Sequence, residues 1–367
     1  MVKYKNHKYT KFVLIILLLV FSLFIFSKAA TISSILFQVV FNHNIELIKH
    51  DNRVNLLILG IGGGDHDGAD LTDTMIFSSI NIKDKKITLI SIPRDLWIPE
   101  MGSKINNAYA EGKTKRKGGG IIEAKSVVSK VIGQPIDYVA VVDFSGFVKF
   151  IDLIDGVDVN VDNTFDDYQY PIEGLENDSC GHTQDEIKAF TATVSAELEL
   201  NNYFICRYKH LHFDQGPTHL DGKTALDFVR SRHAQGDEGT DFARSKRQEK
   251  VMKAVKDKTL SLNVLLNPIK VINLYETVKG SIDTNIQISE FDDFIRLFQK
   301  MQKAQIESVV IDYGDKTRKG LLVHPDVTEQ YKYQWVLIPE KGLGDYTDVQ
   351  KYVKCEVAVG NCALSPK

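Results

Sequence analysis

A stripe of polar and apolar side chains at helical spacing carries the first chemical signal: Arg244, Arg247, Gln248, Val251 and Val255. Residues at this spacing share one face of a helix, and the apolar end of that face packs on a core. Thr240 or Asp241 caps the helix, and a helix N-terminus favours anions. Buried guanidinium groups need an anionic partner. The stripe is therefore either part of a phosphate site or a pair of structural salt bridges.

Two further arginines, Arg230 and Arg232, lie just before this helix. Asp221 is the expected N-cap of a preceding helix that ends near Arg230. Residues two apart point the same way only on an extended chain, so Arg230 and Arg232 can serve one site if the helix stops there. The following segment 233–239 contains two glycines and is predicted to be a loop. Arginines grouped around such a loop suit a ligand with more than one phosphate.

An acidic, glycine-rich loop spans residues 60–73, after the first predicted strand. Asp65 stands where G-x-G-x-x-G requires its last glycine, no Walker A lysine follows, and Ala69 replaces a ligand of the EF-hand pattern. The loop still supplies four carboxylates, from Asp65, Asp67, Asp70 and Asp73. Carboxylate oxygens are the ligands that Mg²⁺ or Mn²⁺ prefers. A solvated acidic loop is the alternative.

A fifth arginine, Arg94, follows another apolar strand within Ser-Ile-Pro-Arg-Asp at 91–95. Because Pro93 stops strand pairing, Arg94 is placed at the end of a sheet. The chain lacks both G-x-S-x-G and H-E-x-x-H, so neither a serine-hydrolase elbow nor a zinc-protease helix is supported.

An uncharged apolar stretch at residues 12–30 follows the four lysines Lys3, Lys5, Lys8 and Lys11. Its length suits a transmembrane helix, and the preceding basic residues predict a cytoplasmic tail at 1–11 and an extracytoplasmic body. A cleaved signal peptide and a buried core helix are the alternatives. Residues 31–52 are predicted to be a linker.

Composition limits the class of protein. The chain has 367 residues, 43% hydrophobic and 25% charged, and its net charge of −3 gives no basic field for nucleic acid. Proximity favours two disulfides in an exported body, Cys180–Cys206 and Cys355–Cys362, although four unrelated thiols are the alternative. No Cys-x-x-Cys occurs, so the cysteines support neither zinc nor thioredoxin-like chemistry.

The elements that must position these residues alternate between strand and helix. Strands are expected at 54–59, 74–81, 87–92, 138–144, 157–161, 308–312 and 333–338. Helices are expected at 120–132, 147–154, 184–200, 221–230, 242–258 and 285–303. The short polar connection at 83–86 predicts an antiparallel hairpin. This order predicts an α/β sandwich with a buried mixed sheet, and the C-terminal stretch is expected to complete the same sheet.

Several ordered motifs resemble the LytR-CpsA-Psr family of cell-wall glycopolymer ligases. They are LLILGI at 56–61, TDTM at 72–75, SIPRD at 91–95, KINNAY at 104–109, DGVDV at 155–159, DGKTAL at 221–226, VRSR at 229–232, DFAR at 241–244 and RQ at 247–248. The resemblance implies a three-layer α/β/α sandwich with a mixed central sheet and an apolar channel for a polyprenyl tail. The resemblance covers roughly residues 53–305 and includes the N-terminal anchor. The catalytic domain is expected at 53–340, with 341–367 as a C-terminal extension.

By this resemblance, the protein transfers a glycan phosphate from a polyprenyl-pyrophosphate carrier to peptidoglycan. Asp73 would hold the metal, and the pyrophosphate would be bound by Arg94, Arg230, Arg232 and Arg244, with weaker contributions from Arg247 and Gln248. Asp241 would orient the acceptor hydroxyl or an arginine. The alternatives are a hydrolase acting on the same glycolipid and a non-catalytic glycolipid-binding or regulatory wall protein.

The chain departs from the family pattern at two positions. Gly62 stands where members usually carry an aspartate, and Leu71 where they often carry an arginine. The metal site therefore lacks one expected ligand, which Asp70, Asp67 or Asp65 would have to replace.

Overall fold

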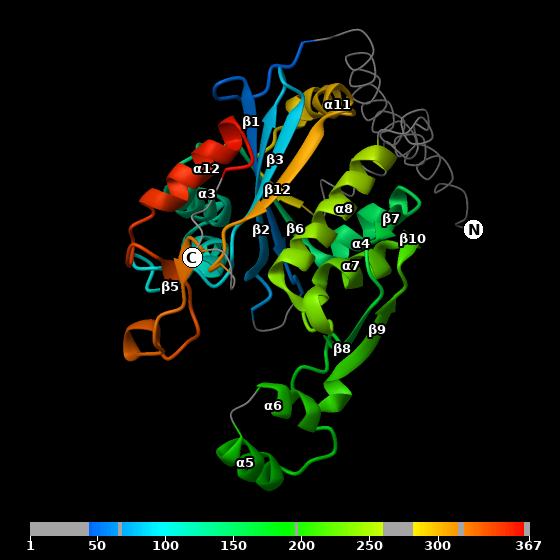
Figure 1. Ribbon diagram of the computed structural model, residues 1–367, viewed down its shortest axis with the longest axis vertical. Helices are drawn as coiled ribbons and strands as arrows, with labels where there is room; N and C mark the ends of the chain where they lie inside the picture. Colours follow the sequence, from blue (N-terminus) through cyan, green and yellow to red (C-terminus); the bar gives the residue numbers. More distant parts are fainter. Residues whose placement is uncertain (1–43, 65–67, 195–196, 260–281, 315–318, 363–367) are drawn as a thin grey trace, which may run out of the picture.

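A six-stranded mixed sheet forms the centre of the molecule in the computed structural model, which describes residues 44–64, 68–194, 197–259, 282–314 and 319–362 (Figure 1). Its order is β11 (Ile282–Thr284), β6 (Tyr138–Asp143), β1 (Arg53–Ile61), β2 (Thr72–Asn81), β3 (Lys86–Ser91) and β12 (Gln305–Val310). Strands β1, β2 and β3 are antiparallel neighbours, whereas β6 runs parallel to β1 and β12 parallel to β3. The predicted hairpin and the mixed sheet are confirmed.

Helices cover both faces of this sheet (Figure 1). On one face, Leu57 and Phe77 share a core with α3 (Gly119–Ile132) and α12 (Thr347–Ala358). On the other face, Ile76 packs with α11 (Phe291–Lys300). Because successive side chains of a strand point to opposite faces and both faces are covered, no residue of β1 or β2 is exposed.

A second core lies beside the sheet and is built from α4 (Phe144–Leu153), β7 (Val157–Val161), β10 (Gly216–Leu220), α7 (Gly222–Arg230) and α8 (Asp241–Thr259). Strands β8 (Phe165–Pro171) and β9 (Tyr208–Phe213) form an antiparallel ribbon that starts at this core and extends away from the sheet. The ribbon ends in a lobe containing α5 (Gln184–Thr193) and α6 (Glu197–Tyr203) (Figure 1).

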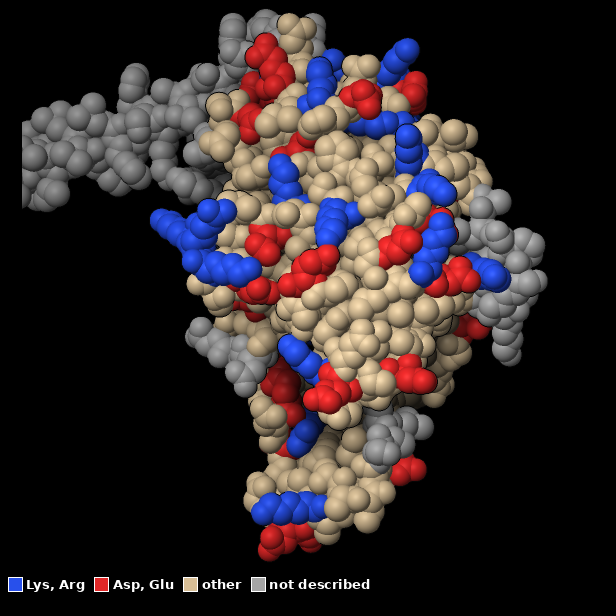
Figure 2. Space-filling model, turned by 90° about the vertical axis from the view of Figure 1, so that its left-hand side faces the viewer, with Lys and Arg blue, Asp and Glu red and all other residues tan. Residues whose placement is uncertain are grey.

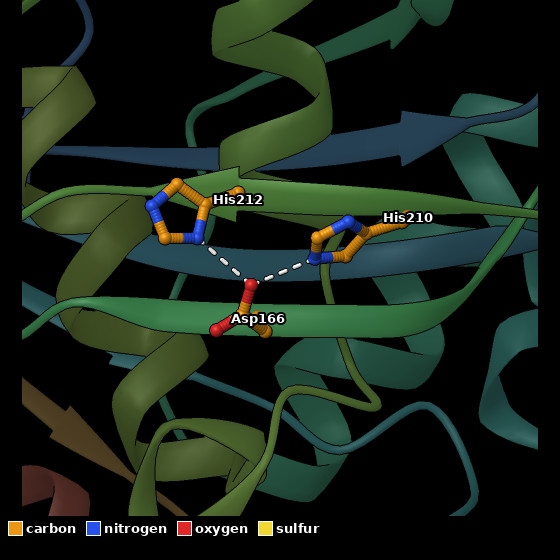
Figure 3. Close-up of side chains that lie close together, drawn as sticks. All are labelled: Asp166, His210 and His212. Carbon is orange, nitrogen blue, oxygen red and sulfur yellow. Dashed lines mark hydrogen bonds and ion pairs between the residues drawn. The ribbon is translucent and has the colours of Figure 1, made fainter.

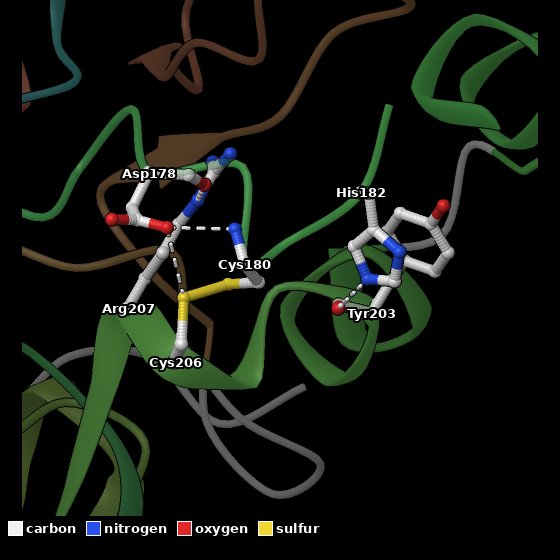
Figure 4. Close-up of a disulfide and its surroundings, with 6 residues drawn as sticks. All are labelled: Asp178, Cys180, His182, Tyr203, Cys206 and Arg207. Atoms are coloured by element: carbon white, nitrogen blue, oxygen red, sulfur yellow. Dashed lines mark hydrogen bonds between the residues drawn. A yellow bond between two sulfur atoms is a disulfide. The ribbon is translucent and has the colours of Figure 1, made fainter. Parts of the chain in front are cut away.

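The structure joins Cys180 to Cys206 at the base of this lobe, and Cys355 to Cys362 at the end of α12, which is the predicted pairing. Asp178 accepts a hydrogen bond from the Cys180 amide at 2.7 Å (Figure 4). Inside the lobe, the His182 ring stacks on Tyr203, with ring centroids 4.0 Å apart. A lobe without a large core is thus held by one cross-link and a few ring contacts.

Short elements complete the described chain. They are β4 (Trp97–Ile98), β5 (Ser103–Lys104), α2 (Ala108–Lys115), β13 (Leu322–Val323) and β14 (Ile338–Pro339), with 3-10 turns at Ile105–Asn107, Ile205–Arg207, Gly236–Gly239, Ile288–Glu290 and Glu329–Tyr331. On the face shown in Figure 2, basic and acidic side chains are interspersed among uncharged ones, in keeping with the small net charge.

Several predicted elements need correction. The helix expected at 184–200 is divided between α5 and α6, and the segment 285–303 turns helical only at 288. Segment 333–338 is not a strand of the sheet, and the described C-terminal residues form α12 instead of completing the sheet. In these segments the local pattern was overridden by tertiary packing, on which strand formation depends more than on sequence propensity.

The predicted anchor at 12–30 lies outside the described residues. Within the part that the structure describes, no helix has both the length and the hydrophobicity that a membrane crossing requires.

Candidate active site

Asp73 and Arg94 meet where strands β2 and β3 of the central sheet end on the same side. Strands β2 and β3 are antiparallel, so the first residues of β2 and the residues that follow β3 lie at the same end of these strands. Arg94 Nη1 donates to Asp73 Oδ1 at 2.5 Å, and both side chains are about one-third exposed, at 37% each. The Ile-Pro-Arg segment therefore delivers its arginine to the sheet end, as predicted.

Arg230 and Arg232 reach this end of the sheet from the C-terminus of α7. Helix α7 is capped by Asp221, whose carboxylate accepts from the Thr224 amide at 2.7 Å, and it stops at Arg230 because Ser231 is extended. Arg232 Nη2 donates to the Asp73 carbonyl at 3.3 Å. The predicted helix end and the shared direction of the two arginines are both present.

A buried carboxylate holds this extended segment in place. Asp167 on β8 is fully buried, and its Oδ2 accepts from the Ser231 hydroxyl at 2.7 Å and from the His233 amide at 3.3 Å. A charged acceptor inside the protein forms stronger hydrogen bonds than a neutral one. Asp167 thus fixes the backbone on which Arg230 and Arg232 lie.

Two aromatic rings fix the guanidinium of Arg230. Its Cζ lies 3.9 Å from the centroid of the Phe144 ring, and its Nη1 donates to the Tyr170 hydroxyl at 3.3 Å. Burial raises the pKa of Tyr170 more than the nearby Arg230 charge lowers it, so this hydroxyl stays protonated at neutral pH. Cation–π contact orients the arginine without neutralising its charge.

These groups line one pocket of about 170 Å³ together with Arg244 and Gln248. Four guanidinium groups, from Arg94, Arg230, Arg232 and Arg244, face two carboxylates, Asp73 and Asp167. The excess positive charge and the pocket's size suit a compact anion such as a phosphate or pyrophosphate group. Gln248 Nε2 lies 3.5 Å from Thr74 Oγ1 at the rim.

Helix α8 supplies Arg244 but uses its next arginine differently. The side chain of Arg247 is only 4% exposed, and its guanidinium donates to three carbonyls, of Phe228, Ser231 and Glu238, and to the Glu238 carboxylate. Burial lowers the pKa of Arg247, and the Glu238 charge opposes that shift. Arg247 therefore braces the segment 231–239 and does not line the arginine pocket, which favours the structural salt bridge over the weak substrate contact that the sequence left open for it.

Asp241 begins α8, and its side chain lies outside what the structure describes. The cap of this helix is Thr240, whose Oγ1 accepts from the Ala243 amide at 3.2 Å.

A larger cavity of about 810 Å³ lies next to the arginine pocket. A cleft of about 40 Å³ connects the two regions, because it shares Arg94 and Arg244 with the arginine pocket and Val310 and Asp312 with the cavity. The cavity lining mixes apolar residues such as Phe165 and Phe228 with charged ones such as Lys246 and Lys250. The resemblance implies an apolar channel for a polyprenyl tail, and the lining of this cavity is only partly apolar.

Among the described residues of the acidic loop, Asp73 lines the pocket and Asp70 does not. Asp73 lies there, whereas both oxygens of Asp70 bind Lys113 Nζ, at 2.7 and 2.9 Å. Asp67 lies outside the described residues. Asp73 fits a Mg²⁺ ligand by donor type, and Asp70 fits only after release from Lys113.

Sequence reasoning missed Phe144, Asp167, Tyr170 and His233 as pocket residues. Strand β8 supplies two of them from a stretch without clear periodicity. Strand β8 pairs with β9, about 40 residues later in the chain, so no local pattern indicated that its residues reach the pocket.

Comparison with known proteins places this geometry in a family. The model of the LytR_cpsA_psr family matches residues 23–335. The polyisoprenyl-teichoic acid–peptidoglycan teichoic acid transferase TagU of Bacillus mycoides is 27% identical over 291 residues, which is 77% of each chain. The TagU protein of Bacillus cereus is 29% identical over 290 residues, again 77% of each chain.

Solved structures share the fold. The crystal structure of Bacillus subtilis TagV superposes with a TM-score of 0.53 and 22% identity, covering 84% of this chain and 98% of that one. A structure of TagT bound to LI-WTA gives a TM-score of 0.51 and 20% identity, covering 87% and 96%.

Proposed function

This chain belongs to the LytR-CpsA-Psr family, and we propose that it transfers a glycan phosphate from a polyprenyl-pyrophosphate carrier to peptidoglycan. The observation that carries the proposal is the convergence of Arg94, Arg230, Arg232 and Arg244 on one pocket. Relatives named as teichoic acid transferases act between a polyisoprenyl carrier and peptidoglycan, which supports the same substrate classes here.

In this reaction, a sugar hydroxyl of peptidoglycan attacks the phosphorus that bears the glycan. The bond from that phosphorus to the bridging oxygen breaks, polyprenyl phosphate leaves, and the hydroxyl proton is lost. Negative charge grows on the bridging oxygen as this bond breaks. Arginines already fixed around the pocket stabilise that charge without reorganising, which lowers the barrier.

The proposal includes Mg²⁺ or Mn²⁺ as cofactor, held by Asp73 together with Asp70 or Asp67. Bound there, the ion would neutralise phosphate oxygens as a Lewis acid. Arg94 and Arg232 lie against Asp73 and would orient its carboxylate. Asp241 remains the proposed group for orienting the acceptor or an arginine, and Gln248 a weaker contact at the rim.

We also propose that residues 12–30 anchor the chain in the cell membrane, with residues 1–11 in the cytoplasm and the described body outside. The charge asymmetry around the apolar stretch supports this orientation. A carrier lipid stays in the membrane, so an anchored enzyme would meet its substrate in two dimensions.

Turnover of defined substrates tests the function. The full-length chain is mixed with a polyprenyl-pyrophosphate oligosaccharide and a peptidoglycan oligomer, with Mg²⁺ or with a chelator. Mass spectrometry should detect a phosphodiester-linked product and free polyprenyl phosphate in the Mg²⁺ sample. Release of glycan phosphate without coupling would instead identify a hydrolase, and binding without turnover a glycolipid-binding protein.

A further inference from the structure

Two histidines and an aspartate converge on the outer face of the β8–β9 ribbon (Figure 3). His210 and His212 come from β9 and Asp166 from β8, and both imidazoles point at the same carboxylate. Asp166 Oδ1 lies 2.7 Å from His210 Nε2 and 2.8 Å from His212 Nδ1. The neighbouring Asp167 faces inward to the arginine pocket, so this cluster belongs to the opposite face.

Strand geometry brings these donors together. Residues two apart on a strand share a face, and Asp166 is the direct cross-strand partner of His212. The three donor atoms lie within 4.8 Å of one another. Around a tetrahedral Zn²⁺ with bonds of about 2.0–2.2 Å, donors are separated by about 3.3 Å. To bind such an ion, the two Asp166–His separations must each widen by about half an ångström, and the separation of the two imidazole nitrogens, at most 4.8 Å, must become about 3.3 Å.

Contacts outside the triad restrain the imidazoles as metal ligands require. His212 uses its other nitrogen, Nε2, toward Asp214 Oδ1 at 3.2 Å. A carboxylate bound to the second nitrogen fixes the tautomer and strengthens the ligand. The His210 ring stacks on Tyr168, with centroids 4.2 Å apart and planes within 4°.

We propose that Asp166, His210 and His212 bind a divalent transition-metal ion. Zn²⁺ is the ion that this set of donor atoms suits best. Two imidazoles and one carboxylate leave the fourth position open to water. The triad's half-exposed side chains are reachable from solvent, and hard Mg²⁺ would be a poor competitor for nitrogen donors.

The bound ion would join β8 to β9 beside the segment that carries Arg232. The Gln235 amide donates to the Asp166 carbonyl at 2.9 Å, and Ala234 pairs with Asp167 across a β-bridge. A metal on Asp166 therefore stabilises the strand against which the arginine segment is docked. This site is separate from the proposed Mg²⁺ ligands and does not depend on the proposed transfer reaction.

Zinc binding itself is the test. The full-length chain is stripped with chelator, equilibrated with buffered Zn²⁺ in excess Mg²⁺, and assayed for bound zinc by elemental analysis and for unfolding temperature. The variants are His210→Gln and His212→Asn, which keep a hydrogen bond to Asp166 but remove the imidazole. The control is His219→Asn, because His219 on β10 also forms a surface pair with an aspartate, Asp158, 2.7 Å apart. Among the described residues, no second histidine converges on that pair.

We expect one Zn²⁺ per chain and a zinc-dependent rise in unfolding temperature for the wild type and for His219→Asn. Each ligand variant should weaken Zn²⁺ binding by more than the roughly 10–100-fold typical of losing an outer partner. Without zinc, the variants should unfold at the same temperature as the stripped wild type, which shows that they are folded. Failure of the wild type to bind zinc, or equal loss in His219→Asn, would overturn the site.

Discussion

Phe144 and Tyr170 fix the guanidinium of Arg230 in the arginine pocket. We expect Arg230→Ala to lower the transfer rate by about 10²–10³, the usual cost of losing one preorganised charge-stabilising donor. Arg207→Ala is the matched control: Arg207 also stacks on a ring, that of Phe204 at 3.7 Å, but lies at the lobe. Steady-state kinetics of both variants decide the prediction, and wild-type turnover by Arg230→Ala would refute the role of the pocket. We expect a loss of the same order for Arg244→Ala.

The metal ligands are a second prediction at the scale of single residues. Asp73→Asn should abolish Mg²⁺-dependent activity, and either Asp67→Asn or Asp70→Asn should lower the apparent Mg²⁺ affinity. The structure sharpens this test, because Lys113 holds Asp70. If Asp70 is a ligand, Lys113→Gln should raise the apparent Mg²⁺ affinity, since the carboxylate no longer has to leave an ammonium group.

Metal titrations of activity separate these cases. Unchanged Mg²⁺ dependence in the Asp73, Asp67, Asp70 and Lys113 variants would mean that the acidic loop is a solvated surface. In that event, the reading as a glycolipid-binding protein gains support.

At the scale of elements, the buried side chain of Arg247 braces the segment 231–239 from α8. Arg247→Met removes the guanidinium that satisfies three carbonyls and the Glu238 carboxylate. Leaving a charge and buried acceptors unpaired should lower the free energy of unfolding by about 3–5 kcal/mol. Urea denaturation measures this loss.

A second buried arginine provides the control for that element. Arg296 on α11 is 5% exposed and pairs with Asp292 and Asp293, away from the pocket. Arg296→Met should therefore destabilise the protein by a similar mechanism, yet keep normal transfer below its unfolding temperature. If both variants lost activity equally while still folded, Arg247 would have no particular role in positioning the arginine segment.

At the scale of the whole molecule, one experiment tests both the membrane orientation of the chain and the pairing of its cysteines. Protease added to intact cells should digest the body, because the basic residues before position 12 are expected to keep only the tail inside. Non-reducing peptide mapping of the released fragments should show Cys180 linked to Cys206 and Cys355 linked to Cys362. A protected body would contradict the orientation, and other linkages would contradict the pairing.

The sequence alone determined the features that depend on local order. Apolar runs, and the glycine, proline and polar residues that end them, predicted β1, β2, β3 and the helix that ends at Arg230. These elements could be predicted because their hydrophobic pattern extends over only a few neighbouring residues. Ordered motifs also identified the family, which the match over residues 23–335 confirms. They named the four arginines of the pocket, although periodicity gave no reason why they should meet.

Only the tertiary structure decided what surrounds those arginines. Strand β8 brings Asp167 and Tyr170 to residues some 60 positions later, and no local pattern encodes that pairing. The same holds for Arg247, whose spacing matched a ligand but whose burial made it a brace. It holds for His210 and His212 as well, since their shared partner Asp166 lies on another strand. The chemical type of each side chain is known from the sequence. The role of that side chain depends on whether the packed elements bury it or expose it, and on which other side chains they bring next to it.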